Sequence, residues 1–169
     1  MNTYSVPTLT FSTRGPVDWK STTVFEEEYE PTLRLGTYDK RVVLDTCEEN
    51  TAYLYVNGKM AGETYGASPK QIWLGLDEHI IDTDKDDQLS CYCYSTTILP
   101  DYQGQGYGKL LKAFWLGVVS TNRFQRAIGH ATSDAMRNTL KHFGAKFGRE
   151  HDNWEGSSRT ATFYSIELS

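Results

Sequence analysis

Short runs of β-branched and aromatic residues stand out in the first half of the chain. Two of them, at residues 41–47 and 51–56, have the composition typical of strands. Asn57-Gly58 follows the second run, and this dipeptide accepts positive φ at both central positions of a tight turn. Residues 59–65 then supply a returning strand. The pattern therefore predicts a strand at 41–47 and a β-hairpin over 51–65.

Farther along the chain, strands alternate with helices. Apolar residues recur at helical spacing over 109–120, which predicts a helix with one buried face. A second helix can be capped by Ser133 or Asp134 and stopped by Gly144, and residues 69–74 favour a short one. The strands predicted in this half are residues 90–99, 125–131, 145–150 and 160–168. The whole pattern indicates a mixed α/β sheet.

The first forty residues and the acidic segment at 82–87 are less informative. Prolines and a glycine interrupt residues 1–40, and residues 25–30 fit either a short acidic helix or an exposed strand. Aspartates alternate at 82–87 like the opening of a calcium loop. However, Asp87 stands where that loop needs glycine, and Cys93 where it needs glutamate. We interpret the acidic segment as a solvated loop and expect no metal site.

Length and charge narrow the class of protein. A chain of 169 residues, with 38% hydrophobic and 23% charged residues, fits one soluble globular domain over residues 1–169. The formal net charge of −5 disfavours broad capture of nucleic acid or of an anionic membrane, and it suits a cationic partner. We see neither an apolar run of the ~20 residues that a membrane span needs nor a secretory signal. The cytoplasm is therefore the expected compartment.

Cysteines are few in this chain. The three present, Cys47, Cys91 and Cys93, are too few and too scattered to give a disulfide framework. Cys91 and Cys93 share one face of their predicted strand, and we interpret them as buried substitutes for apolar residues. We therefore expect reduced thiols.

The segment between the strand at 90–99 and the helix at 109–120 carries the most chemical information. It reads Pro100-Asp101-Tyr102-Gln103-Gly104-Gln105-Gly106-Tyr107-Gly108. Glycine lets a ligand approach the main chain closely, and the free N–H groups and dipole at a helix start bind phosphate oxygens. A purely structural turn is the alternative. The segment lacks the Gly-Lys-Ser/Thr ending of a nucleoside-triphosphate loop, and a dinucleotide-binding fold carries its glycines after the first strand.

Gln103, Gly106 and Gly108 match the Gln/Arg-x-x-Gly-x-Gly/Ala signature of the GNAT superfamily of N-acyltransferases, and the chain resembles that family beyond this motif. The hairpin before the turn, and the strand, helix and stopping glycine after it, follow the family's order over roughly residues 41–168. The resemblance implies a mixed, mostly antiparallel central sheet, broken near its middle, with helices on both faces. It also implies direct attack of a primary amine on the thioester of acetyl-CoA, without a metal or a covalent enzyme intermediate.

The same resemblance implies a segment that binds the cofactor. Main-chain groups of Ile98 and Leu99 would pair with the pantetheine arm. The N–H groups that would hold the pyrophosphate belong to Gln103, Gly104, Gln105, Gly106, Tyr107 and Gly108. The family commonly has an asparagine where this chain has Ser133, which can hydrogen-bond the cofactor or serve only as a helix cap.

The expected catalytic groups depart from the family's pattern. Leu140 stands where the family has the tyrosine that protonates the departing sulfur, so this acid is missing or comes from elsewhere, and Tyr94 is one alternative. Tyr92 and Ile128 occupy the usual positions of a glutamate base. His130 lies two residues beyond Ile128, hence on the same strand face, and imidazole titrates near neutrality. We predict His130 as the base, with Tyr92 able to orient a water, although a histidine satisfied at a strand end has the same sequence pattern.

The sequence thus predicts an N-acetyltransferase that uses acetyl-CoA and a small-molecule or protein amine, cationic in view of the net charge. The alternative is a GNAT-like module with weak or absent catalysis that acts by binding a protein partner, which the missing tyrosine motivates. A general binder of phosphate ligands is a third hypothesis. The acceptor, the acyl chain length and the oligomeric state, a homodimer included, stay open.

Overall fold

The computed structural model describes residues 5–15, 23–76 and 80–168. Its centre is a seven-stranded sheet in the order β1-β2-β3-β4-β5-β7-β6. Strands β4 and β5 run parallel, and every other neighbouring pair is antiparallel. The strands are β1 (Leu9–Ser12), β2 (Thr51–Val56), β3 (Lys59–Ala67), β4 (Ser90–Ile98), β5 (Arg126–Ala131), β6 (Lys146–His151) and β7 (Ala161–Glu167). The predicted hairpin is confirmed, with positive φ at Asn57 and Gly58.

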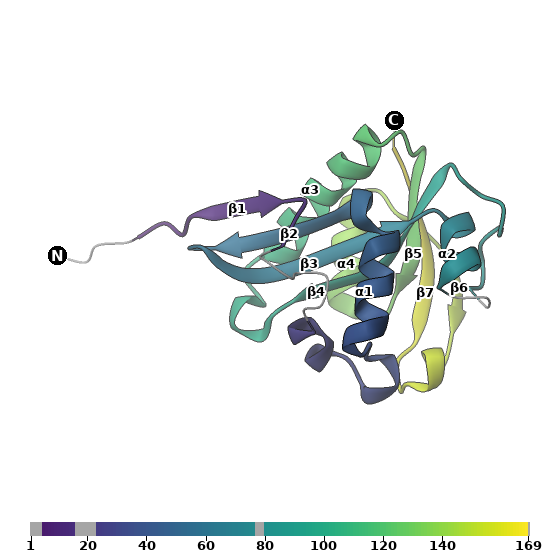
Figure 1. Ribbon diagram of the computed structural model, residues 1–169, viewed down its shortest axis with the longest axis horizontal. Helices are drawn as coiled ribbons and strands as arrows, with labels where there is room; N and C mark the ends of the chain where they lie inside the picture. The colour runs from purple at the N-terminus through teal and green to yellow at the C-terminus, as the bar shows by residue number, and fades with distance from the viewer. Residues whose placement is uncertain (1–4, 16–22, 77–79, 169) are drawn as a thin grey trace.

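Helices cover both faces of the sheet, as Figure 1 shows, and with the strand pairing this confirms the expected fold class. The α-helices are α1 (Thr37–Thr46), α2 (Pro69–Gly75), α3 (Tyr107–Thr121) and α4 (Asp134–His142). The core on one face includes Leu111 and Trp115 of α3 and Leu140 of α4. The core on the other face includes Leu44 of α1 and Ile72 of α2.

Residues 41–47 form the second part of helix α1 and its C-cap, so the strand predicted there is wrong. The buried positions of this segment follow the helical spacing i, i+3, i+4 and i+7. They are Lys40, Val43, Leu44 and Cys47. Burial of one helical stripe against the sheet therefore overrides the strand propensity of the paired valines.

The sheet opens between its two parallel strands. β4 pairs with β5 only as far as Cys93 and Gly129. Beyond that point β4 continues alongside β3 up to Ile98, whereas β5 continues alongside β7 up to Ala131. We call this opening the fork, and it is the predicted break near the middle of the sheet.

A β-bulge lies at the fork. Tyr94 is the extra residue of β4 opposite the step from Tyr65 to Gly66 in β3. Bulges bend a strand and re-aim the side chain that they contain. Glycine is required at position 66, because a Cβ there would overlap the carbonyl oxygen of Tyr92. The close approach of β3 and β4 therefore depends on this one residue.

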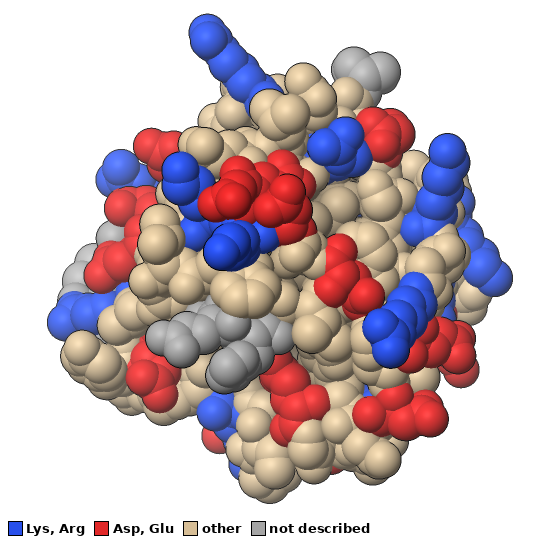
Figure 2. All heavy atoms as spheres, turned by 90° about the vertical axis from the view of Figure 1, so that its right-hand side faces the viewer, with Lys and Arg blue, Asp and Glu red and all other residues tan. Residues whose placement is uncertain are grey.

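A short 3-10 helix, η2 (Val24–Glu28), lies between β1 and α1, so the helical alternative for residues 25–30 holds over its first part. Acidic and basic side chains are interspersed on the face shown in Figure 2. Among the residues that the structure describes, none of the helices has the length and apolar character that crossing a membrane requires.

Candidate active site

A cavity of about 790 Å³ opens at the fork. Its walls come from both faces of the sheet. They include η2 and the loop after it, β4, the start of α3, β5 and the start of α4. A volume of this size lies within the range of roughly 300–1,000 Å³ that small-molecule sites occupy. The break in the sheet therefore produces a space in which two ligands can meet from opposite faces.

The glycine turn forms one end of this cavity. Gly104 and Gly106 have φ of 75° and 82°, and Gly106 is the N-cap of α3. No atom lies within 4 Å of the position that a Cβ would take at either glycine. The N–H groups of the first helical turn have no acceptor within the helix, and exposed Lys109 adds a positive charge beside them. The open space, the free amides and the charge together fit a diphosphate.

The remaining cofactor residues predicted from the sequence differ in position. Ile98 lines the cavity, and its carbonyl oxygen accepts a hydrogen bond from Gln103 Nε2 at 2.8 Å. The N–H of Leu99 donates to the carbonyl oxygen of Ala61 at 2.8 Å, so β3 already uses this group. Gln105 donates to the carbonyl oxygen of Asp101 and, like Leu99, is not part of the cavity wall. Of the predicted pantetheine-binding pair, only Ile98 lines the cavity.

Ser133 caps helix α4. Its hydroxyl oxygen accepts a hydrogen bond from the N–H of Met136 at 3.1 Å. The side chain also lines the cavity. The structure therefore contains the plain helix cap and leaves the hydroxyl within reach of a ligand.

Tyr92 and His130, both predicted from the sequence, are joined to Asp82 in a chain of hydrogen bonds. The Tyr92 hydroxyl lies 2.7 Å from His130 Nδ1, and His130 Nε2 lies 3.0 Å from Asp82 Oδ2. Because a carboxylate only accepts hydrogen bonds, His130 Nε2 carries the proton and Nδ1 accepts from Tyr92. Tyr92 and His130 line the cavity, and we call the three residues the relay.

The surroundings of the relay keep His130 neutral and Asp82 charged. Burial lowers the pKa of His130, and the hydrogen bond and charge of Asp82 oppose this only in part. Burial alone would raise the pKa of Asp82, but hydrogen bonds from His130 and His151 outweigh it and lower that pKa. The ring of Trp154 stacks on His130 with centroids 4.4 Å apart. A neutral imidazole held in one tautomer is able to accept a proton at Nδ1.

Asp82 belongs to the segment that the sequence suggested was a solvated loop. Its side chain is only 16% exposed, because the loop lies over the ends of β5 and β6. Neither the pairing with His130, 48 residues away, nor that with His151, 69 residues away, has a local sequence signal. His142, by contrast, is exposed on α4.

Tyr94 lies at the bulge and lines the cavity. Its ring stacks on that of Tyr65, with centroids 6.1 Å apart. Tyr94 therefore forms part of the cavity wall.

Three further residues at the fork were not predicted as functional. Lys112, a buried lysine on the apolar stripe of α3, lies with Nζ 3.2 Å from the sulfur of Cys93 and 2.8 Å from Thr96 Oγ1. Burial alone would raise the pKa of Cys93, but the ammonium and the neighbouring hydroxyl groups lower it. Tyr164 of β7 hydrogen-bonds Cys93, and burial raises the pKa of its phenol well above the usual value. Cys93 is therefore no simple apolar substitute.

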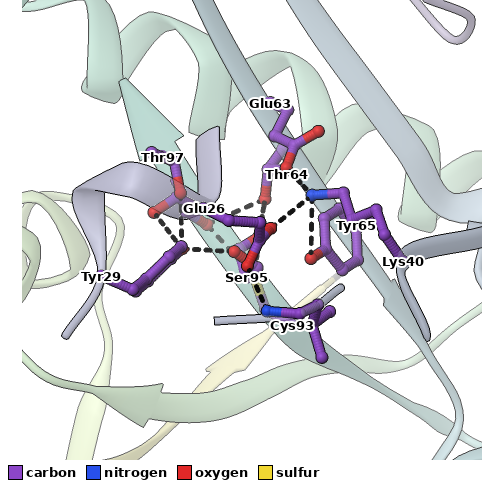
Figure 3. A network of polar contacts seen from close by, with 11 residues as sticks. Glu26, Tyr29, Lys40, Glu63, Thr64, Tyr65, Cys93, Ser95 and Thr97 are labelled. Atoms are coloured by element: carbon purple, nitrogen blue, oxygen red, sulfur yellow. Dashed lines mark hydrogen bonds and ion pairs between the residues drawn. The ribbon is translucent and has the colours of Figure 1, made fainter. Parts of the chain in front are cut away.

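A dense polar network borders the cavity on the α1 side (Figure 3). The ammonium of fully buried Lys40 donates to Glu26 Oε1 at 2.8 Å and to Glu63 Oε1, and lies 3.4 Å from the Tyr65 hydroxyl. Tyr29 hydrogen-bonds Ser95 and Thr97 of β4 beside it. Burial raises the pKa of Glu63 to about 7 although Lys40 opposes this shift. We call Glu26, Lys40 and Glu63 the carboxylate–lysine cluster.

Searches of protein-family models and of curated proteins give no match to this sequence. Solved structures give many matches. A GNAT-family acetyltransferase from Streptococcus pneumoniae matches with a TM-score of 0.70 and 14% identity, over 96% of this chain and all of the other. The ribosomal-protein-S18-alanine N-acetyltransferase from Escherichia coli matches with a TM-score of 0.67 and 15% identity, over 96% of this chain and 95% of the other.

Naa50 from Arabidopsis thaliana, solved in complex with the bisubstrate analogue CoA-Ac-MVNAL, matches with a TM-score of 0.67 and 14% identity. The match covers 95% of this chain and 99% of that chain. At these identities the likeness concerns the fold. The chain has the fold of the GNAT N-acetyltransferases, as its sequence motif suggested.

Proposed function

We propose that this GNAT-fold chain is an acyl-CoA-dependent N-acetyltransferase that acts on a primary amine. The observation that carries the proposal is the cavity at the fork, which joins the glycine turn at one end to a histidine relay at the other. The neighbouring structures support acetyl transfer in general. The acceptor and the roles of individual residues are our proposal.

Acetyl-CoA supplies the activated carbonyl carbon that the amine attacks. In this chain, the amides of residues 106–108 and the Lys109 ammonium would hold the diphosphate at the start of α3. The fork would admit the thioester just beyond Cys93 and Gly129, the last residues at which β4 pairs with β5. Positioning of the two reactants supplies a large share of the rate in reactions of this kind.

The amine must lose a proton before or during attack. We propose that the relay takes it up, with the Tyr92 hydroxyl passing its own proton to His130 Nδ1 as it accepts one from the amine or from an intervening water. The resulting imidazolium would be stabilised by the Asp82 carboxylate. The proton would end on His130 and leave through solvent.

The departing sulfur must gain a proton, and Leu140 cannot provide it. Tyr164 of β7 is a candidate donor, because it lines the cavity at the fork and burial keeps its phenol protonated. The second proton that the attacking nitrogen loses would restore the phenol. Tyr94 of β4 is the second candidate.

The acceptor side suits a protonated amine. Glu28 and Glu155 line the cavity there, and the ring of Tyr94 offers a face that attracts cations. The ring of Tyr65 behind it already has the Lys40 ammonium over it, at 4.8 Å from the centroid. Two of the fold neighbours are described by their action on a protein or by a peptide-based analogue. We propose a peptide N-terminus or a lysine side chain as the acceptor.

Calorimetry with acetyl-CoA, followed by release of free thiol in the presence of polyamines, lysine and short peptides with free N-termini, tests the proposal. His130→Gln should keep the affinity for acetyl-CoA and lower kcat/KM by a factor on the order of 100 to 1,000. The exposed His142→Gln is the matched control and should behave like the wild type. Absence of any heat with acetyl-CoA would contradict the proposal at its root.

A second function, a non-catalytic module that binds a protein partner, is favoured by one observation. Leu140 is fully buried in the apolar core, where the family's usual acid would have to face the sulfur. Tight binding of acetyl-CoA without thiol release for any amine would support this second function over the first.

A further inference from the structure

Asp82, His130 and His151 form a cluster whose ligand atoms converge. The two histidine Nε2 atoms lie 3.0 Å and 2.5 Å from the same oxygen of Asp82, and the ligand atoms of all three residues lie within 4.8 Å of one another. They come from the loop after α2, from β5 and from the end of β6. The proton relay needs only one of these histidines. The second imidazole, His151, hydrogen-bonds Asp82 but takes up no proton in the proposed reaction.

The chemistry of this donor set is specific. Two imidazole nitrogens and one carboxylate oxygen suit Zn²⁺ and related transition metals rather than Mg²⁺ or Ca²⁺, which prefer oxygen ligands only. Zinc binds such atoms at about 2.0–2.2 Å, so neighbouring ligands of a tetrahedral site lie roughly 3.3 Å apart. The two observed distances between the Asp82 oxygen and the histidine Nε2 atoms are both shorter than this ligand separation. One is shorter by a few tenths of an ångström and the other by under one ångström. A small outward shift of the carboxylate would open the site.

The cluster also has the support and the access that a metal site needs. His130 is held at its other nitrogen by the Tyr92 hydroxyl, which is the outer contact that orients metal-bound histidines. Trp154 packs against both imidazoles, with centroids 4.4 Å from His130 and 5.8 Å from His151. A second cavity of about 440 Å³ is lined in part by His151 and Trp154. One of the three ligands therefore borders open space from which an ion could approach.

We propose that Asp82, His130 and His151 bind Zn²⁺, and that the bound metal switches off the relay. To bind through Nε2, the neutral His130 moves its proton from Nε2 to Nδ1, without net loss of a proton. Nδ1 then donates to the Tyr92 oxygen and has no lone pair with which to accept a proton. Metal binding and proton uptake at His130 thus exclude each other. The metal site stands on the cluster alone, whereas the inhibition rests on the proposed function.

Titration of chelator-treated wild-type protein with Zn²⁺ by calorimetry tests the site. We expect one equivalent to bind with a dissociation constant in the micromolar range or below. His151→Gln should weaken binding at least tenfold, whereas His142→Gln on α4 should bind as the wild type does. Mg²⁺ should give no heat. Co²⁺, used as a second probe, should give the visible absorption of tetrahedral coordination in the wild type and lose it in His151→Gln.

Transfer assays with and without Zn²⁺ test the switch. The glutamine in His151→Gln keeps an N–H donor for Asp82, so this variant should stay active and become insensitive to Zn²⁺ that inhibits the wild type. Equal Zn²⁺ affinity in wild type and His151→Gln would overturn the site. Binding that depends on His151 but leaves transfer unchanged would overturn the switch. Metal binding with no transfer under any condition would uphold the site and count against the proposed function alone.

Discussion

The two sides of the fork are built in different ways. The turn side, residues 98–108 with the start of α3, consists of one continuous segment whose backbone geometry and free amides make the site. The α1 side consists of side chains from distant segments, in the carboxylate–lysine cluster and in the relay. A local backbone site tolerates changes in the surrounding side chains, whereas a site assembled from distant side chains depends on each member.

The largest effect should come from breaking the α1 side. Lys40→Met leaves the Glu26 and Glu63 carboxylates buried without their ammonium partner, and such a loss costs about 3–5 kcal/mol in free energy of unfolding. For a chain of this size that corresponds to a fall in Tm of roughly 10 °C. Thermal and urea unfolding would measure it. Exposed Lys141→Met is the control and should change stability little.

The pH dependence of this loss has a definite sign. The pKa of Glu63 is about 7 in the folded protein, above the ordinary value of 4.5. Between these values the folded state binds more protons than the unfolded state, so this residue's unfavourable contribution to stability grows as pH rises and is complete above pH 7. The destabilisation by Lys40→Met should therefore be smaller at pH 5 than at pH 8. An equal loss at both values would contradict the buried, raised-pKa state of Glu63.

On the turn side, Gly106→Val should lower the affinity for acetyl-CoA by a factor on the order of 100 while the fold survives. A β-branched residue is strained at φ 82°, at a cost of roughly 1–2 kcal/mol, and its side chain would fill the open space in which we propose that the diphosphate binds. Calorimetry measures the affinity. Gly117→Ala within α3 has open space and an ordinary helical backbone, so it should bind as the wild type does. Unchanged affinity in Gly106→Val would show that the turn is only structural.

The smallest effect concerns the cysteines. Lys112 helps to lower the pKa of Cys93, whereas burial raises the pKa of Cys47 and Cys91. Because the thiolate is the reactive form, Cys93 should be alkylated by iodoacetamide about tenfold faster than the other two near neutral pH. Peptide mass spectrometry would follow each thiol. Lys112→Met should remove the difference, and labelling in urea, where all three react alike, serves as the control. Uniform labelling of the folded wild type would be the contrary result.

The same contrast explains what the sequence could predict. The hairpin, the glycine turn and the capped helix α4 were predictable because turn chemistry and caps act over a few residues. Tyr92 was singled out because it stands at the family's usual position of a base, and His130 because strand alternation places it on the face of Ile128; the structure brings the two to 2.7 Å from each other.

The remaining features depend on contacts that no local pattern contains. Residues 41–47 were mistaken for a strand because their helical conformation comes from packing of the buried side of α1 against the sheet. Their intrinsic helix propensity is low. Asp82 was interpreted as solvated because its two histidine partners lie 48 and 69 residues away. Lys112 is the missed residue that the sequence could most readily have indicated, because a lysine on an otherwise apolar side of a helix requires a buried partner.

Gly66 has a consequence for two residues of the proposed chemistry, Tyr92 and Tyr94. Because β3 touches the main chain of β4 there, one extra methyl group would push the two strands apart and displace the bulge that carries Tyr94. The separation of β3 and β4 beside the fork is thus set by a residue that has no Cβ atom. Any residue larger than glycine at position 66 would collide with backbone, whichever molecule the cavity receives.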